Sequence, residues 1–156
     1  MSRRGWGFLL MVAIVLCACT PGTPYHRFLP LPQEGWNRAD TVAFDLPVIA
    51  DARECKLQVE LRATRLFPYT DLWIGVEQRD SDQVLLCYDT LHIDMADSTG
   101  RLDGHGLTLL EYASAPLALA CTPRGGCRQV RLFHLMSRET VAGLSDVGLR
   151  VSRSQH

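Results

Sequence analysis

The chain of 156 residues has almost no lysine: Lys56 is its sole example, and arginine supplies the rest of its 16 basic side chains. These are mixed along the sequence with 17 acidic residues, and no segment concentrates positive charge. A nucleic-acid-binding surface needs such a concentration on one face. The sequence therefore predicts no nucleic-acid partner.

The sequence also lacks the short motifs of common enzyme classes. It has no G-x-S-x-G elbow, no H-E-x-x-H motif, no phosphate-binding loop and no G-x-G-x-x-G. The histidines are scattered without the spacing of metal ligands, and they are His26, His92, His105, His134 and His156. His92 and His134 fall in alternating segments, where we expect them on the polar face. We expect no catalytic residue, no cofactor and no metal, and hence a protein that is not an enzyme.

Aspartates gather in two places without the loop sequence of a calcium site. Asp80 and Asp82 form one pair, and Asp94, Asp97 and Asp103 form a looser group. Loop carboxylates hold calcium in some sandwich proteins, so calcium is the less favoured alternative here. Turn formation is the preferred interpretation.

Helical periodicity is nearly absent from the sequence. No window of a dozen residues sustains a 3.6-residue period, and the best candidate for a short helix is residues 137–144. Apolar and polar residues instead alternate with period two in residues 41–48, 56–62, 72–76, 91–95, 129–132 and 147–152. Turn-forming residues separate these segments. About seven or eight such strands predict an all-β fold, an antiparallel β-sandwich of jelly-roll type.

The longest apolar run lies at the N-terminus. Arg3 and Arg4 precede apolar residues 6–18, a run too short to cross a bilayer comfortably as a permanent helix. It ends in Leu16-Cys17-Ala18-Cys19, which matches the lipobox of bacterial lipoprotein signals. We predict a signal peptide over 1–18, lipidation of Cys19, a tether over 19–35 and one sandwich domain over 36–156. An ordinary signal peptide or an uncleaved anchor is the alternative.

Four cysteines follow the predicted lipidation site: Cys55, Cys87, Cys121 and Cys127. An even number outside the cytoplasm favours disulfides. Cys121 and Cys127 flank a five-residue turn, and a Cys55–Cys87 bond would follow by elimination. Buried free thiols are the alternative, whereas the paired C-x-x-C spacing of zinc sites is missing.

Three aromatic residues are candidates for a partner or glycan surface: Trp36, Tyr69 and Trp73. Trp73 alternates with Leu72 and Ile74, which places it on the outer face of its strand. Burial is the favoured alternative for all three, because large aromatic side chains are mostly buried. For Trp36 we expect a plug at one end of the sandwich.

Two other features belong to the sheet itself. Gly148, inside a predicted strand, indicates the close approach of another backbone or an aromatic ring lying over it. For Arg62 and Arg150 we expect pairing with carboxylates across the sheet.

An ordered series of segments resembles the GldH family of gliding motility lipoproteins from Bacteroidetes. After the lipobox and Trp36 come residues 40–46 (DTVAFDL), 61–74 (LRATRLFPYTDLWI) and 141–151 (VAGLSDVGLRV). The chain departs from the family pattern with Phe67 in place of a tyrosine and Asp71 in place of an asparagine.

The resemblance implies a membrane-anchored, non-enzymatic accessory of the gliding or type IX secretion machinery. Its partners would be other envelope proteins, and the lipid anchor would hold it at a membrane, facing the periplasm rather than the cell surface. A carbohydrate-binding sandwich of the cell envelope is the alternative function.

Overall fold

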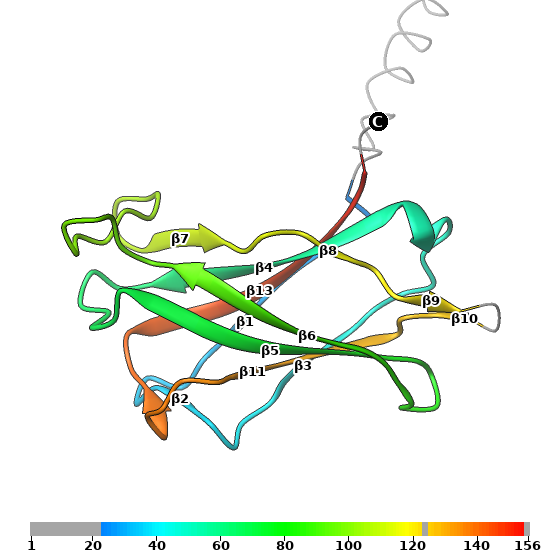
Figure 1. Ribbon diagram of the computed structural model, residues 1–156, viewed down its shortest axis with the longest axis horizontal. Helices are drawn as coiled ribbons and strands as arrows, with labels where there is room; N and C mark the ends of the chain where they lie inside the picture. Colours follow the sequence, from blue (N-terminus) through cyan, green and yellow to red (C-terminus); the bar gives the residue numbers. More distant parts are fainter. Residues whose placement is uncertain (1–22, 123–124, 155–156) are drawn as a thin grey trace, which may run out of the picture.

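The computed structural model describes residues 23–122 and 125–154. The predicted signal peptide and Cys19 lie outside these residues. The described part of the chain forms two antiparallel β-sheets that face one another (Figure 1). Its helical content is one 3-10 turn, η2 (Ala52–Glu54), and none of its helices has the length and apolar character needed to span a bilayer.

Eight strands build the two sheets in jelly-roll order. The first sheet follows the order β1 (Tyr25–Pro30), β13 (Leu144–Arg153), β4 (Cys55–Ala63) and β7 (Leu110–Ala113). The second follows the order β3 (Val42–Asp45), β11 (Gln129–His134), β5 (Asp71–Arg79) and β6 (Leu85–Asp94). The predicted all-β jelly-roll sandwich is thus confirmed.

Shorter strands complete the described structure. They are β8 (Leu117–Ala118), which pairs with β4, and two ribbons, β2 (Trp36–Asn37) with β12 (Thr140–Val141) and β9 (Cys121–Thr122) with β10 (Gly125–Gly126).

The core lies between the two sheets and follows the alternation in the sequence. In β4, β5 and β13, alternate apolar residues have no exposed surface, namely Leu57, Val59, Leu61, Leu72, Ile74, Val76, Val147, Leu149 and Val151. Because successive side chains of a strand point to opposite faces, the residues between these face outward. The outer faces of the two sheets therefore carry the side chains that are free to meet a partner.

Trp36 closes one end of the sandwich, as expected. It has no exposed surface, and its indole nitrogen donates a hydrogen bond to the backbone oxygen of Asp40 at 3.0 Å. Its ring meets the ring of His134 edge-on, with the centroids 5.7 Å apart.

Two boundary predictions were wrong. Residues 137–144 form no helix, because Thr140 and Val141 pair with β2 and Leu144 already begins β13. Between these strands Gly143 has a φ of +90° and packs against the backbone of Phe67. In addition, residues 25–30 of the expected tether form β1 and pair with β13, so the sandwich begins before Trp36.

His134 is buried in the core, whereas the sequence predicted it on a polar face. Its side chain has no exposed surface. Burial disfavours the imidazolium and lowers the pKa of His134 below its ordinary value of 6.5, and the charge of Arg38 acts in the same direction. The folded protein therefore holds this histidine in its neutral form.

Replacing His134 by leucine is expected to remove part of the acid sensitivity of the fold. Below about pH 6.5 the unfolded chain protonates this histidine before the folded chain does, so stability falls by ~1.4 kcal/mol per pH unit until the folded-state pKa is reached. Urea unfolding between pH 5 and pH 7.5 measures this slope. Exposed His105→Asn is the control and should keep the wild-type slope; equal slopes in wild type and His134→Leu would contradict the account.

The expected Cys121–Cys127 disulfide is not formed. Cys121 pairs with Gly126, while the amide of Cys127 bonds the oxygen of Ala120. The two cysteines thus sit at rungs one residue apart, where side chains point to opposite faces. The Cys127 thiol bonds the oxygen of Gln129, and burial raises its pKa to about 11.

The Cys55–Cys87 bond is absent as well. All four cysteines in the described residues are free thiols. Cys55 lies in the first sheet, and its backbone oxygen accepts from Leu119. Cys87 lies in the second sheet opposite Gln78, whose amide bonds Ala118 and Ala120. The segment 118–120 therefore bridges β4, which carries Cys55, and β5, the neighbour of the strand that carries Cys87.

Candidate functional site

Aromatic and aliphatic side chains gather on the outer face of the second sheet. We call this set, from three neighbouring strands, the aromatic face; it consists of Trp73, Tyr88, His92, Phe133 and Leu135. Trp73 is 42% exposed, Tyr88 48% and Leu135 41%. Monomeric proteins seldom place large apolar side chains side by side in water without a function.

Gly75 lets the aromatic face pack closely on the sheet. The ring of Phe133, on the neighbouring strand, lies over Gly75 so tightly that a Cβ there would come within 2.5 Å of a ring carbon. The ring of Tyr88 follows, with its centroid 6.3 Å from that of Phe133. The side chains therefore form a band across β11, β5 and β6.

At the end of the aromatic face formed by Trp73 and His92, Asp71 fixes the orientation of both rings. One carboxylate oxygen, Oδ2, accepts the indole N–H of Trp73 at 3.1 Å and contacts Nε2 of His92 at 3.0 Å. The rings of Trp73 and His92 lie with their centroids 4.4 Å apart and their planes 34° apart. An exposed indole held in one orientation loses little conformational entropy when a partner binds.

An ion-pair cluster borders the band on the same face. Glu77 pairs with Arg79 at 2.8 Å and with Arg131 at 3.6 Å. With one carboxylate and two guanidinium groups, this cluster carries a net charge of +1. Arg131 lies beside Glu77 in the strand register, and Glu77 beside Tyr88.

The structure separates the three aromatic residues that the sequence nominated. Trp36 is wholly buried at the end of the core and cannot belong to a surface. Tyr69 is half-buried, edge-on to Phe67 with centroids 5.5 Å apart. Trp73 alone of the three lies on an open face, as its alternation predicted. Its neighbours Tyr88 and Phe133 were missed, although Phe133 alternates with the buried Leu132 and His134. Tyr88 gives a weaker signal, because its chain neighbours are half-buried.

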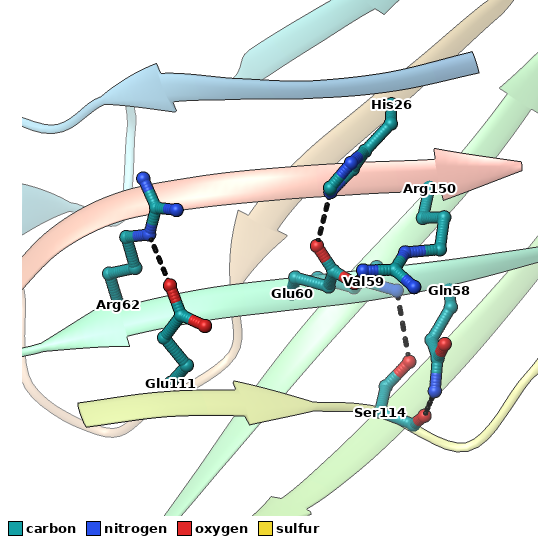
Figure 2. A network of polar contacts seen from close by, with 8 residues as sticks. All are labelled: His26, Gln58, Val59, Glu60, Arg62, Glu111, Ser114 and Arg150. Atoms are coloured by element: carbon teal, nitrogen blue, oxygen red, sulfur yellow. Dashed lines mark hydrogen bonds and ion pairs between the residues drawn. The ribbon is translucent and has the colours of Figure 1, made fainter. Parts of the chain in front are cut away.

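The outer face of the first sheet carries a polar network instead. Figure 2 shows His26 of β1 and Arg150 of β13 converging on Glu60 of β4. Each contacts one oxygen of that carboxylate at 2.7 Å, and Glu60 is 7% exposed. The sequence did not single out His26 or Glu60, because nothing in their spacing shows that β1 and β4 flank β13.

Both sheet features predicted from the sequence are present beside this network. The ring of Phe28 lies over Gly148, where a Cβ would stand 2.6 Å from a ring carbon. The guanidinium of Arg62 lies over the same ring, 3.9 Å from its centroid, and pairs with Glu111 at 2.9 Å. A cation over an aromatic face is attractive, so this group holds β1, β4 and β7 together.

A pocket of about 240 Å³ opens next to the network. Its lining consists of His26, Phe28, Glu60, Arg62, His105, Glu111, Tyr112, Ala113 and Arg150. This lining holds ion pairs formed among its own residues, and no serine, threonine or cysteine to act as a nucleophile. In the described residues no group of three or more metal-ligating side chains is placed to hold an ion.

Two of the aspartates considered for calcium, Asp80 and Asp97, serve as turn acceptors. Asp80 Oδ1 accepts from the amides of Asp82 and Val84, and Asp97 Oδ1 accepts from Thr99 and Arg101. Their oxygens thus satisfy backbone donors within their own loops.

Comparison with known proteins identifies the family. The sequence profile described as GldH lipoprotein matches residues 23–151, which cover both sheets except for the last two residues of β13. The chain belongs to the GldH lipoprotein family. The gliding motility lipoprotein GldH of Flavobacterium johnsoniae is 29% identical over 159 aligned positions, which cover 98% of this chain and 99% of that protein.

Among solved structures, this GldH-family chain is similar to the VP2 subviral particle of infectious bursal disease virus. The TM-score is 0.37 with 11% identity, over 85% of this chain and 34% of the viral chain.

Family membership confirms the resemblance that the sequence indicated. The segments that carried it lie together in the GldH-family fold: residues 61–74 run from the end of β4 into β5, and residues 141–151 run from β12 into β13. The segment 61–74 includes Trp73 and therefore supplies the fixed indole of the aromatic face.

Proposed function

We propose that this protein is a non-enzymatic interaction component of the gliding motility or type IX secretion-related machinery, held at the membrane by a lipid on Cys19. The aromatic face is the observation that carries the proposal. Exposed, rigidly held Trp and Tyr side chains are the residues that most often dominate binding energy at protein interfaces. The family name of the Flavobacterium relative supplies the cellular process.

The position of the aromatic face suits a tethered binding module. The described chain enters the sandwich at Tyr25, which pairs with Val151 near the end of the last strand. β1 then leads to Trp36, whose ring touches His134. Leu135 follows His134 and donates its amide to the oxygen of Trp73 at 2.8 Å. Trp73 thus lies toward the end of the sandwich that is remote from Tyr25, where the described chain enters it.

A double substitution, Trp73→Ala with Tyr88→Ala, is expected to release the partner without unfolding the protein. Loss of two interface anchors at about 2 kcal/mol or more each weakens binding by about a thousandfold. The test is crosslinking and recovery of the tagged, lipidated protein from membranes of its own host, followed by mass spectrometry. Wild type should recover motility or secretion proteins, and the double variant should lose them.

Two further variants make the result interpretable. Leu66→Ala with Leu107→Ala removes two side chains that are 87% and 92% exposed and lie outside the aromatic face; this control should keep the partners. Cys19→Ala should lose membrane attachment, since stable anchoring depends on several acyl chains. Recovery of envelope glycans in place of motility proteins would reject the proposal and favour the carbohydrate-binding alternative.

A further inference from the structure

Strand β6 forms an unpaired edge of the second sheet. The strand order ends at β6, whose sole partner among the described strands is β5. β6 spans ten residues, whereas the opposite edge, β3, spans four. An exposed edge of this length is a template for another strand unless the protein protects it.

The register shows which backbone groups of β6 are available. The amide of Met95 bonds the oxygen of Thr70, across from β6. Backbone groups alternate in direction along a strand, so those of odd-numbered residues face β5 and those of even-numbered residues face away from it. The second set belongs to Tyr88, Thr90, His92 and Asp94, all of which are exposed.

Proline, basic side chains and an internal bulge, three of the usual protective devices, are missing from this part of the edge, although Asp89 is an inward-pointing charge of the protective kind. β6 contains no proline, lysine or arginine. Its one register shift lies at the beginning, where Arg79 pairs with Leu85. By contrast, β1 ends in Pro30, and β7 is four residues long.

Charge decides what kind of strand suits this edge. Residues 80–100 include five aspartates and neither a lysine nor an arginine. Asp89 is half-buried on the core side of β6, and the exposed Asp94 follows on its outer side. A second copy of this chain would place acidic residues beside acidic residues and be repelled. A partner strand with basic side chains would be attracted.

We propose that β6 binds an extended, basic segment of a partner protein, which adds a fifth strand to the second sheet next to the aromatic face. Backbone hydrogen bonds from Tyr88 to Asp94 supply affinity and direction. Alternate side chains of the segment lie on the outer face beside Tyr88, His92 and Asp94, and a cation among them faces Asp94. The inference rests on the proposed binding function and specifies the surface and the partner chemistry.

Hydrogen exchange with defined peptides tests the proposal. The lipidated full chain in detergent micelles is mixed with a blocked nine-residue peptide that alternates arginine with threonine, at about ten times its Kd. Amide exchange at Tyr88, Thr90, His92 and Asp94 should then slow by about tenfold. The matched peptide with glutamate in place of arginine should have no such effect.

Two proline variants separate edge binding from general disturbance. Thr90→Pro removes an outward N–H of β6 that makes no bond in the sheet, a position where proline is tolerated. Ala43→Pro does the same on β3, where the amide of Leu46 faces β11 and Ala43 therefore faces away. Both variants should fold, and Thr90→Pro alone should abolish peptide protection.

Three results would overturn the edge proposal. The first is unchanged amide exchange at the even-numbered residues of β6 when the arginine peptide is added. The second is equal protection by the glutamate peptide. The third is a loss of peptide protection in Ala43→Pro as large as that in Thr90→Pro. Chitohexaose that quenches Trp73 fluorescence, with β6 unprotected by the arginine peptide, would assign this face to a glycan. If the membrane recovery experiment still depends on Trp73 and Tyr88 while β6 stays unprotected, the binding function stands and the edge proposal fails.

Discussion

Replacing Trp36 by alanine should lower the free energy of unfolding by about 3–5 kcal/mol, the usual cost of truncating a buried tryptophan. The indole has no exposed surface and closes the end of the core between β2 and His134. Its removal leaves a cavity, and it also breaks the bond to the oxygen of Asp40. The ribbon of β2 with β12 has two residue pairs of its own, so it cannot compensate for the lost packing.

Urea unfolding of the lipidated chain in detergent measures this loss. Trp73→Ala is the matched control, because it removes the same side chain from an open face and should cost less than about 1 kcal/mol. Equal losses in the two variants would show that Trp36 does not close the core as described.

Replacing Gln78 by methionine should cost about 2–4 kcal/mol, although the two side chains have nearly the same length. Gln78 has no exposed surface, and its amide bonds the oxygen of Ala118 at 3.0 Å and the amide of Ala120 at 2.8 Å. Methionine makes neither bond, and each bond lost in a protected site costs about 1–2 kcal/mol. The segment 118–120, which passes from the first sheet to the second, would lose its attachment to β5.

Urea unfolding together with amide exchange at Ala120 checks this expectation. Amide exchange at Ala120 should accelerate more than exchange in the strands, because the Ala120 amide donates its hydrogen bond to the Gln78 side chain. Gln129→Met is the control: its amide bonds the exposed carboxylate of Asp45 at 2.8 Å, so its loss should cost less than about 1 kcal/mol. A stable Gln78→Met variant with a protected Ala120 amide would refute the role given to this side chain.

The sequence was sufficient for the architecture, because period-two alternation depends on a local property that each strand carries by itself. Leu57 to Leu61, Leu72 to Val76 and Val147 to Val151 alternate and are buried as predicted. The close packing at Gly148 was also predictable, since a glycine inside a strand indicates that another group approaches the backbone closely. Here the approaching group is the ring of Phe28.

The prediction failed where long-range pairing decides the structure. Residues 137–144 look helical in isolation, but pairing with Trp36 and Asn37 makes two of them a strand. His134 lies two residues after Leu132 and four after Val130, and so points to the same buried face, but its polarity suggested the outer face. For Cys121 and Cys127, the spacing in sequence does not tell to which face of the ribbon each side chain points. That depends on the pairing of Cys121 with Gly126.

The candidate site was predictable in part. Trp73 was placed outward by its neighbours in sequence, but its fixed orientation depends on Asp71 and His92, and the latter lies on another strand. The band with Tyr88 and Phe133 exists because β5 lies between β6 and β11. Alternation does not reveal that strand order. The outward orientation of single residues was therefore predictable, but their assembly into one surface was not.

The pairing of β1 with β13 determines how the fold carries mechanical load. A pull on the residues before Tyr25, resisted by a partner on the second sheet, acts along the axis of β1. Tyr25 to Pro30 pair with Val151 to Asp146, and all six rungs cross that axis. The load is therefore applied in shear: the rungs resist together instead of opening one after another like a zipper. The ring of Phe28, which lies over Gly148, further resists the sliding of β1 past β13.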